Sequence, residues 1–130
     1  MTYTDAVQVI RDAITAATGI PTARVLRPGF TDGPLPLAHV SLVNADPGEY
    51  DRADTISVSI YAKTPASPAE VGAAALADQI EGALAVRPVV GASGWVDEAE
   101  VESTLGVQPY FEAVEVVHMT ITVTHRPISE

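Results

Sequence analysis

The most constraining feature of this sequence is a strand-like segment joined by a short turn to a helix-like segment, over residues 55–85. The first part alternates between apolar and hydroxyl side chains, so that Ile56, Val58 and Ile60 share one side of an extended chain. Such alternation predicts a strand with one buried face. A second layer of structure must cover that face.

The turn after this strand carries signals for the start of a helix. Ser67 and Glu70 have the spacing of a capping box, and Pro68 suits the first helical position, where no amide proton is required. The following residues place apolar side chains on one helical face, and Pro88 prevents continuation. The sequence therefore predicts a helix from Pro68 to Ala85 that covers the strand.

A second amphipathic helix is predicted near the start of the chain, over about residues 4–18. Its apolar residues recur at three-and-four spacing, and Asp5 lies in the first turn, where the helix dipole favours an anion. Thr2 or Thr4 is the expected N-cap. Gly19 is expected to end the helix in the left-handed conformation that a glycine adopts readily.

Several further strands are expected. Residues 22–27 indicate a short edge strand, and residues 37–43 are expected to pair antiparallel with residues 55–62, because no helix separates them. Residues 95–104 predict an extended segment with a glutamate face toward water, and residues 112–125 predict a central strand. The expected fold is a single α+β domain over residues 1–130, with an antiparallel or mixed sheet of 4–5 strands and two helices packed on one face.

Composition limits the classes of function. The chain has no cysteine, which excludes disulfides, thiolate metal sites and thiol nucleophiles. Its formal charge of −10 repels phosphate backbones, so direct nucleic-acid recognition is not expected. No signal peptide or membrane-spanning segment is indicated, so the sequence predicts a soluble protein retained inside the cell, with no membrane partner.

The three histidines do not indicate a catalytic or metal site. His39, His118 and His125 occupy strand-like segments without a second ligand at metal-binding spacing, and each is expected to face solvent. His118 and His125 fall on opposite strand faces, which argues against a shared metal.

The acidic and glycine-rich segments do not indicate a cofactor site either. The carboxylates of residues 46–54 lack the spacing of a helix-loop-helix calcium site, and those of residues 97–102 are more typical of a solvated strand face than of paired catalytic acids. Residues 91–94 lack the lysine of a phosphate-binding loop. We therefore expect no cofactor, no metal and no enzymatic activity.

The connection between the strands at 37–43 and 55–62 is the surface most suggestive of a partner. The predicted tip, residues 45–53, exceeds the two to five residues of ordinary hairpin loops, and it carries residue types enriched at interface centres. A mobile, solvated loop is the alternative interpretation. The predicted protein-interface residues are Asp46, Glu49, Tyr50, Asp51, Arg52 and Asp54.

The order of these elements resembles that of tail terminator (tail completion) proteins of long-tailed bacteriophages. The resemblance covers about residues 4–126, and it includes the segment Tyr61-Ala62-Lys63 and the terminal strand from His118 to Thr124. It implies a ring homo-oligomer, a hexamer in that family, which caps the tail tube protein, stops its polymerisation and joins the head completion or connector protein. It also implies a place in the virion, at the head-proximal end of the tail, after assembly in the host cytoplasm.

Two other classes of function remain open. Another head-tail connector or neck subunit would share the ring geometry and differ only in its partner. A small-ligand or enzyme module would instead present a defined pocket and gain thermal stability from its ligand.

Overall fold

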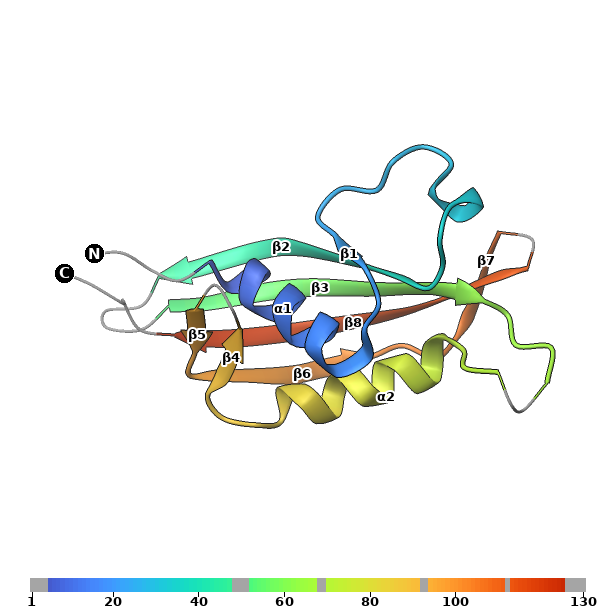
Figure 1. Ribbon diagram of the computed structural model, residues 1–130. Helices are drawn as coiled ribbons and strands as arrows, with labels where there is room; N and C mark the ends of the chain where they lie inside the picture. Colours follow the sequence, from blue (N-terminus) through green and yellow to red (C-terminus); the bar gives the residue numbers. More distant parts are fainter. Residues whose placement is uncertain (1–4, 48–51, 68–69, 92–93, 112, 126–130) are drawn as a thin grey trace.

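The fold is a sheet with two helices and a small hairpin on one face (Figure 1). The structure, a computed structural model, describes residues 5–47, 52–67, 70–91, 94–111 and 113–125. The described residues confirm the predicted α+β class, with a mixed sheet and both helices packed against it.

The main sheet has six strands in the order β1-β2-β3-β8-β6, and β7 pairs with β8 beyond the end of β6. Only the β1–β2 pair is parallel. The predicted sheet of 4–5 strands omitted β7, whose four residues are all exposed and include Pro109, which an edge strand tolerates. The strands are β1 (Thr22–Ala23), β2 (Leu37–Pro47), β3 (Arg52–Lys63), β6 (Glu98–Thr104), β7 (Gln108–Phe111) and β8 (Val114–His125).

The predicted alternation of the two central strands is confirmed. β3 and β8 run antiparallel over their full lengths, with Ile56 opposite Ile121 and Val58 opposite Met119 on the core face. These four side chains are at most 1% exposed. The other face of the same strands carries hydroxyl side chains, such as Ser57 opposite Thr120, that are only partly buried.

The helical layer covers the apolar face of the sheet. It consists of α1 (Ala6–Thr18), α2 (Ala73–Leu84) and the hairpin of β4 (Val89–Gly91) and β5 (Gly94–Val96), with the hairpin beside α1 (Figure 1). Their side chains and those of the sheet form one apolar cluster, in which Ile10, Ile14 and Ile80 are fully enclosed. Neither helix is long and apolar enough to span a bilayer, within the described ranges.

Polar contacts fix the two ends of α1. Asp5, predicted in the first turn, is itself the N-cap, and its side chain accepts from the amide of Gln8 at 3.3 Å. The predicted caps, Thr2 and Thr4, lie outside the described residues. At the other end, Gly19 adopts φ 74° and closes the helix as predicted.

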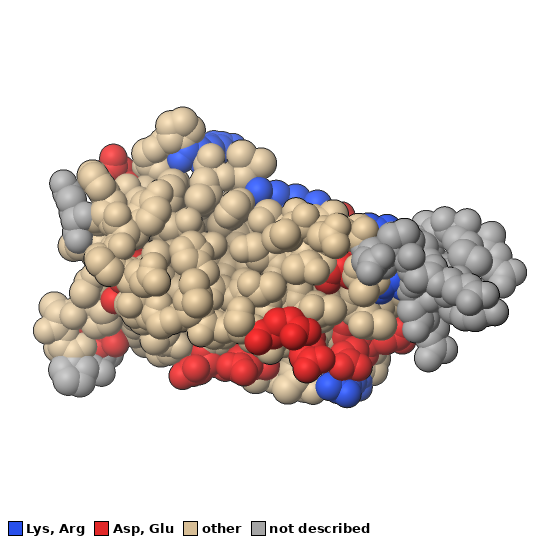
Figure 2. Space-filling model, turned by 180° about the vertical axis from the view of Figure 1, so that it is seen from behind, with Lys and Arg blue, Asp and Glu red and all other residues tan. Residues whose placement is uncertain are grey.

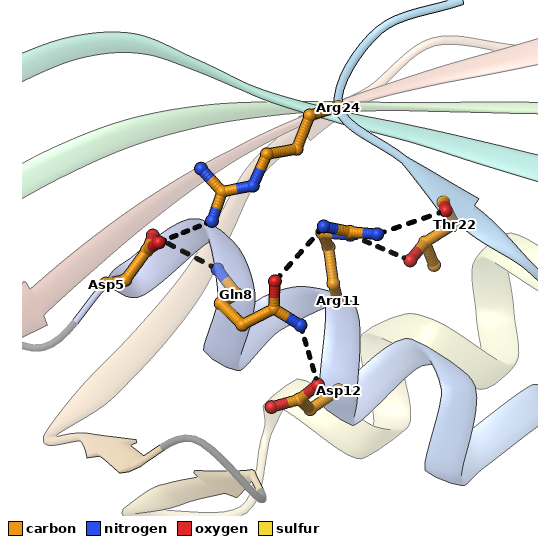
Figure 3. Close-up of polar contacts among 6 residues, drawn as sticks. All are labelled: Asp5, Gln8, Arg11, Asp12, Thr22 and Arg24. Carbon is orange, nitrogen blue, oxygen red and sulfur yellow. Dashed lines mark hydrogen bonds and ion pairs between the residues drawn. The ribbon is translucent and has the colours of Figure 1, made fainter.

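A chain of side-chain contacts joins α1 to β1 (Figure 3). Arg11 donates to the Thr22 hydroxyl at 3.0 Å and to the Gln8 side chain at 3.1 Å. Arg24, just after β1, forms an ion pair with Asp5. The short edge strand is therefore held by the helix as well as by its two backbone pairings with β2.

The start of α2 differs from the prediction. The helix begins at Ala73, after Gly72, and the Glu70 carboxylate accepts from the Ala66 amide rather than capping the helix. The cap comes instead from β8, where the buried Glu115 accepts from the Ala73 amide at 2.8 Å. Gly72 permits this approach, because a Cβ there would lie 2.8 Å from the Glu115 carboxylate.

Replacing Glu115 by alanine is expected to lower the free energy of unfolding by about 1 kcal/mol, because the first turn of α2 loses its acceptor. Amide exchange at the start of α2 should accelerate. Glu70→Ala, the matched control, should change stability by less than about 0.5 kcal/mol, since Glu70 is exposed. Urea unfolding measures both variants. A larger loss of stability in Glu70→Ala than in Glu115→Ala would contradict the role of Glu115 as the acceptor for α2.

Candidate interaction surfaces

The predicted tip is shorter than the sequence suggested. β2 and β3 continue pairing to Asp46 opposite Ala53 and Pro47 opposite Arg52, so residues 45–47 and 52–53 belong to strands. The prediction of a long hairpin tip over residues 45–53 is therefore wrong. Glu49, Tyr50 and Asp51 lie outside the described residues, and their role at an interface stays a prediction.

Asp54, predicted at the interface, is enclosed in the fold. Its residue is 3% exposed, and its carboxylate accepts from Arg52 at 2.7 Å and from His125 at 3.1 Å. These side chains come from the paired ends of β3 and β8. The carboxylate thus joins two strands and faces the interior.

His125 also differs from its prediction, because it is 1% exposed rather than solvent-facing. Its odd spacing from His118 places it on the same strand face as Val123, which was the signal for burial in the sequence. The placement of His118 and His125 on opposite faces is confirmed. His118 meets Ser59 at 2.8 Å, and His39 contacts the Arg24 carbonyl at 2.9 Å. No group of three metal-ligating side chains occurs among the described residues.

Three aromatic rings meet on the other face of the sheet, near the start of β8. Tyr61 lies edge-on to Phe30 and to Tyr110, with ring centroids 4.8 and 4.9 Å apart. Phe30 belongs to a 3-10 turn (Phe30–Asp32) that the sequence did not predict. Val114, Val116 and the loop residues Leu26 and Leu35 complete this smaller apolar cluster.

Burial raises the pKa of Tyr61 above its ordinary value, and the neighbouring Tyr110 phenolate raises it further, while a hydrogen bond with Ser59 opposes the shift. Because the folded state holds the proton more tightly, the Tyr61 contribution to stability is complete below the ordinary pKa of 10.0 and is lost as pH rises through the folded value.

Tyr61→Phe should therefore reduce the loss of thermal stability at alkaline pH, because phenylalanine has no proton to lose. Melting temperatures measured at neutral and alkaline pH test this expectation. An unchanged alkaline slope in Tyr61→Phe would contradict it. In an NMR titration of labelled tyrosine rings, Tyr110→Phe should lower the pKa of Tyr61, because the repulsive phenolate is removed.

The two long edges of the sheet carry opposite charges. Figure 2 shows the face that the helices leave open, with acidic side chains gathered along one edge and basic side chains along the other. On the acidic edge, Glu100 and Glu102 of β6 are exposed, as the sequence predicted, although a register shift between Val101 and Ser103 interrupts the predicted single face. Glu98 is half-buried and pairs with Arg87 at 3.1 Å. On the opposite edge, Arg24 and Arg27 follow β1.

A groove lies beside β1 on the basic edge. It has a volume of about 420 Å³ and lies between β1, the loop after it and the first residue of β2. Its walls are mostly apolar, and Arg27 is the one charged residue of the described ranges that lines it. The apolar walls are contributed by Pro21, Ala23, Val25, Leu26, Pro28, Phe30, Pro34 and Leu37.

A second apolar surface lies on the helical layer. A groove of about 400 Å³ runs between the ends of α1 and α2, lined by alanines and by Val86, Val89 and Val90. Val86 and Val90 are 64% and 67% exposed. Among the described residues, none that lines this groove is charged.

Comparisons with known proteins identify a shared fold. No protein-family profile matches the chain, and no curated protein matches it. The fold is similar to that of a chain in the virion of a native gene transfer agent particle, with a TM-score of 0.54 and 16% sequence identity. The similarity covers 87% of this chain and 84% of that chain. The two chains therefore share one architecture over most of their lengths.

Proposed function

We propose that this protein is a structural subunit of a phage-like virion, and more narrowly a tail terminator whose ring caps the tail tube and stops its growth. The observation that carries the proposal is the shared architecture, over 87% of the chain, with a chain of a virion particle. The order of elements supports the same conclusion independently, through its resemblance to the tail terminator family.

The side-chain chemistry is consistent with a structural role. Within the described fold, the enclosed side chains of Asp54 and His125 and the half-buried Arg52 form a polar cluster that joins two strands. The grooves beside β1 and between the helices have apolar walls, which suit contact with other protein surfaces better than hydrolysis.

A tube-growth assay tests the narrow proposal. Purified tail tube protein of the same particle would be polymerised with and without this chain, and tube lengths measured by electron microscopy. The terminator role predicts rings at one tube end and a halt in elongation at substoichiometric amounts. Unchanged tube growth, with binding to head completion proteins instead, would assign the chain to the connector.

The enzyme or small-ligand alternative has its own readout. A ligand module would gain melting temperature when incubated with a metabolite library, because ligands that bind only the folded state stabilise it. The proposed function predicts no such gain, whereas the addition of tube ends should stabilise the subunit.

A further inference from the structure

The main sheet has two free edges, one along segment 98–111 and the other along the two-residue strand β1 and the rest of β2. Segment 98–111 follows β8 from one end to the other, since β6 pairs with residues 119–124, Leu105 donates to the His118 carbonyl at 2.9 Å, and β7 pairs with residues 114–116. Among the described residues, this segment has a strand neighbour on one side only. The β1 edge is equally open on its outer side. Free edges are the surfaces on which sheets of separate subunits meet.

The free charges of the two edges are complementary. Within the described part of the chain, no basic side chain forms a salt bridge with Glu100 or Glu102, and both are exposed. Arg27 on the other edge is exposed and has no described salt bridge, while Arg24 shares its charge with Asp5. The two charged edges lie on opposite sides of the same sheet (Figure 2). The acidic edge of one subunit can therefore attract the basic edge of a second copy.

The two edges are also complementary in their apolar surface. Leu105 and Val107, between β6 and β7, are 52% and 45% exposed. The basic edge offers the apolar groove of about 420 Å³ beside β1, with Arg27 among its lining residues. An acidic edge that carries exposed apolar residues thus matches a basic edge that contains an apolar groove.

We propose that the segment 98–111 of one subunit docks against the β1 edge of a second copy of this chain. Glu100 and Glu102 then face Arg24 and Arg27, and Leu105 and Val107 enter the groove. Such a contact joins different surfaces of the two copies, so it is heterologous and repeats around a closed ring. This inference rests on the proposed function, because it names the contact between subunits that would form the proposed ring.

Complementary charge reversals test the contact. One variant carries Glu100→Lys and Glu102→Lys, and the other carries Arg24→Glu and Arg27→Glu. Each variant alone should associate at least about tenfold more weakly than the wild type, because like charges then meet at every contact. An equal mixture should recover most of the wild-type association, since every contact between unlike variants is attractive again. Sedimentation velocity at low salt measures all four samples.

Controls separate location from net charge and from folding. Glu70→Lys with Asp78→Lys makes the same change in charge at exposed positions away from both the β6 edge and the β1 groove, and it should leave association unchanged. If the Arg24 change disturbs α1 through Asp5, Arg27→Glu alone serves as the partner in the mixture. Val107→Asp should weaken association, whereas Val90→Asp, on the helical layer, should not.

Several results would overturn the contact. The contact is wrong if either charge variant associates as strongly as the wild type, or if the mixture associates no better than the single variants. It is also wrong if Val90→Asp weakens association as much as Val107→Asp, or if the wild type stays monomeric both alone and with tube ends. The proposed function fails separately. If the mixture recovers but tubes keep growing, the edge contact stands and the terminator role is wrong. If all variants stop tube growth as well as the wild type does, the terminator role stands and the edge contact is wrong.

Discussion

Replacing Ile121 by alanine is expected to lower the free energy of unfolding by about 2–5 kcal/mol. Ile121 lies at the centre of the sheet, opposite Ile56 on β3 and Val101 on β6, and its side chain is fully enclosed. Truncation removes apolar contacts and leaves a cavity that strands on both sides prevent from collapsing. A domain of this size has a total stability of about 5–15 kcal/mol, so the variant should melt far below the wild type.

The matched control is the next residue along the strand. Thr122 points to the face that the helices leave open, opposite Thr55 and Glu100. Thr122→Ala should change the free energy of unfolding by at most about 0.5 kcal/mol. Urea unfolding followed by circular dichroism measures both variants. Equal losses, or a larger loss at Thr122, would mean that the two faces of β8 are reversed.

Replacing Asp54 by alanine is expected to cost about 3 kcal/mol, because the change leaves the imidazole of His125 enclosed without the carboxylate. Arg52 loses its 2.7 Å contact at the same time. Thr55→Ala is the control, since Thr55 is the adjacent residue on the open face. It should have a small effect on stability.

The Asp54 result also decides between two roles for this residue. An exposed interface residue would weaken assembly on substitution and leave the melting temperature nearly unchanged, whereas an enclosed ion-pair residue would do the reverse. A double-mutant cycle with His125→Leu should show coupling, because removing both partners costs less than the sum of the single changes. If the effects of the two substitutions on the free energy of unfolding are additive and the melting temperature is unchanged, Asp54 is an interface residue.

The sheet was predictable where hydrophobic alternation was regular. The pattern at Ile56, Val58 and Ile60 fixed which face of β3 is buried, and the pattern from Val117 to Val123 did the same for β8. Burial of one face allows only one pairing register, since a slip by one residue would expose the apolar set. β7 was missed because its four exposed residues have no such pattern.

The helix starts were less predictable, because the deciding partner can lie far away in the chain. Ser67 and Glu70 matched a capping box, yet Glu115, 42 residues beyond Ala73, accepts from its amide. Local spacing cannot report such a contact. The packing of Gly72 against Pro65 and Glu115 explains why the helix begins after this glycine.

The candidate interaction surface was partly visible in the sequence. The shared face of Glu98 and Glu100 was readable from period-two spacing, whereas Glu102 lies at a register shift between Val101 and Ser103 that the spacing did not indicate. Its counterpart, the groove with Arg27 beside β1, depends on the path of an irregular loop and on which strands lie at the edges. Asp54 was assigned to the tip because the paired strands extend further than the predicted boundary at residue 55. His125 lay within the predicted strand, and its spacing from Val123, which indicates the buried face, was not used.

Electron cryomicroscopy of this protein on the end of its tail tube would image the contact between subunits. The terminator role and the edge contact together predict a closed ring of identical subunits at one end of the tube, with the segment 98–111 of each subunit against the β1 edge of the next. A single bound copy, or two-fold contacts that join the same edge of two subunits, would contradict it.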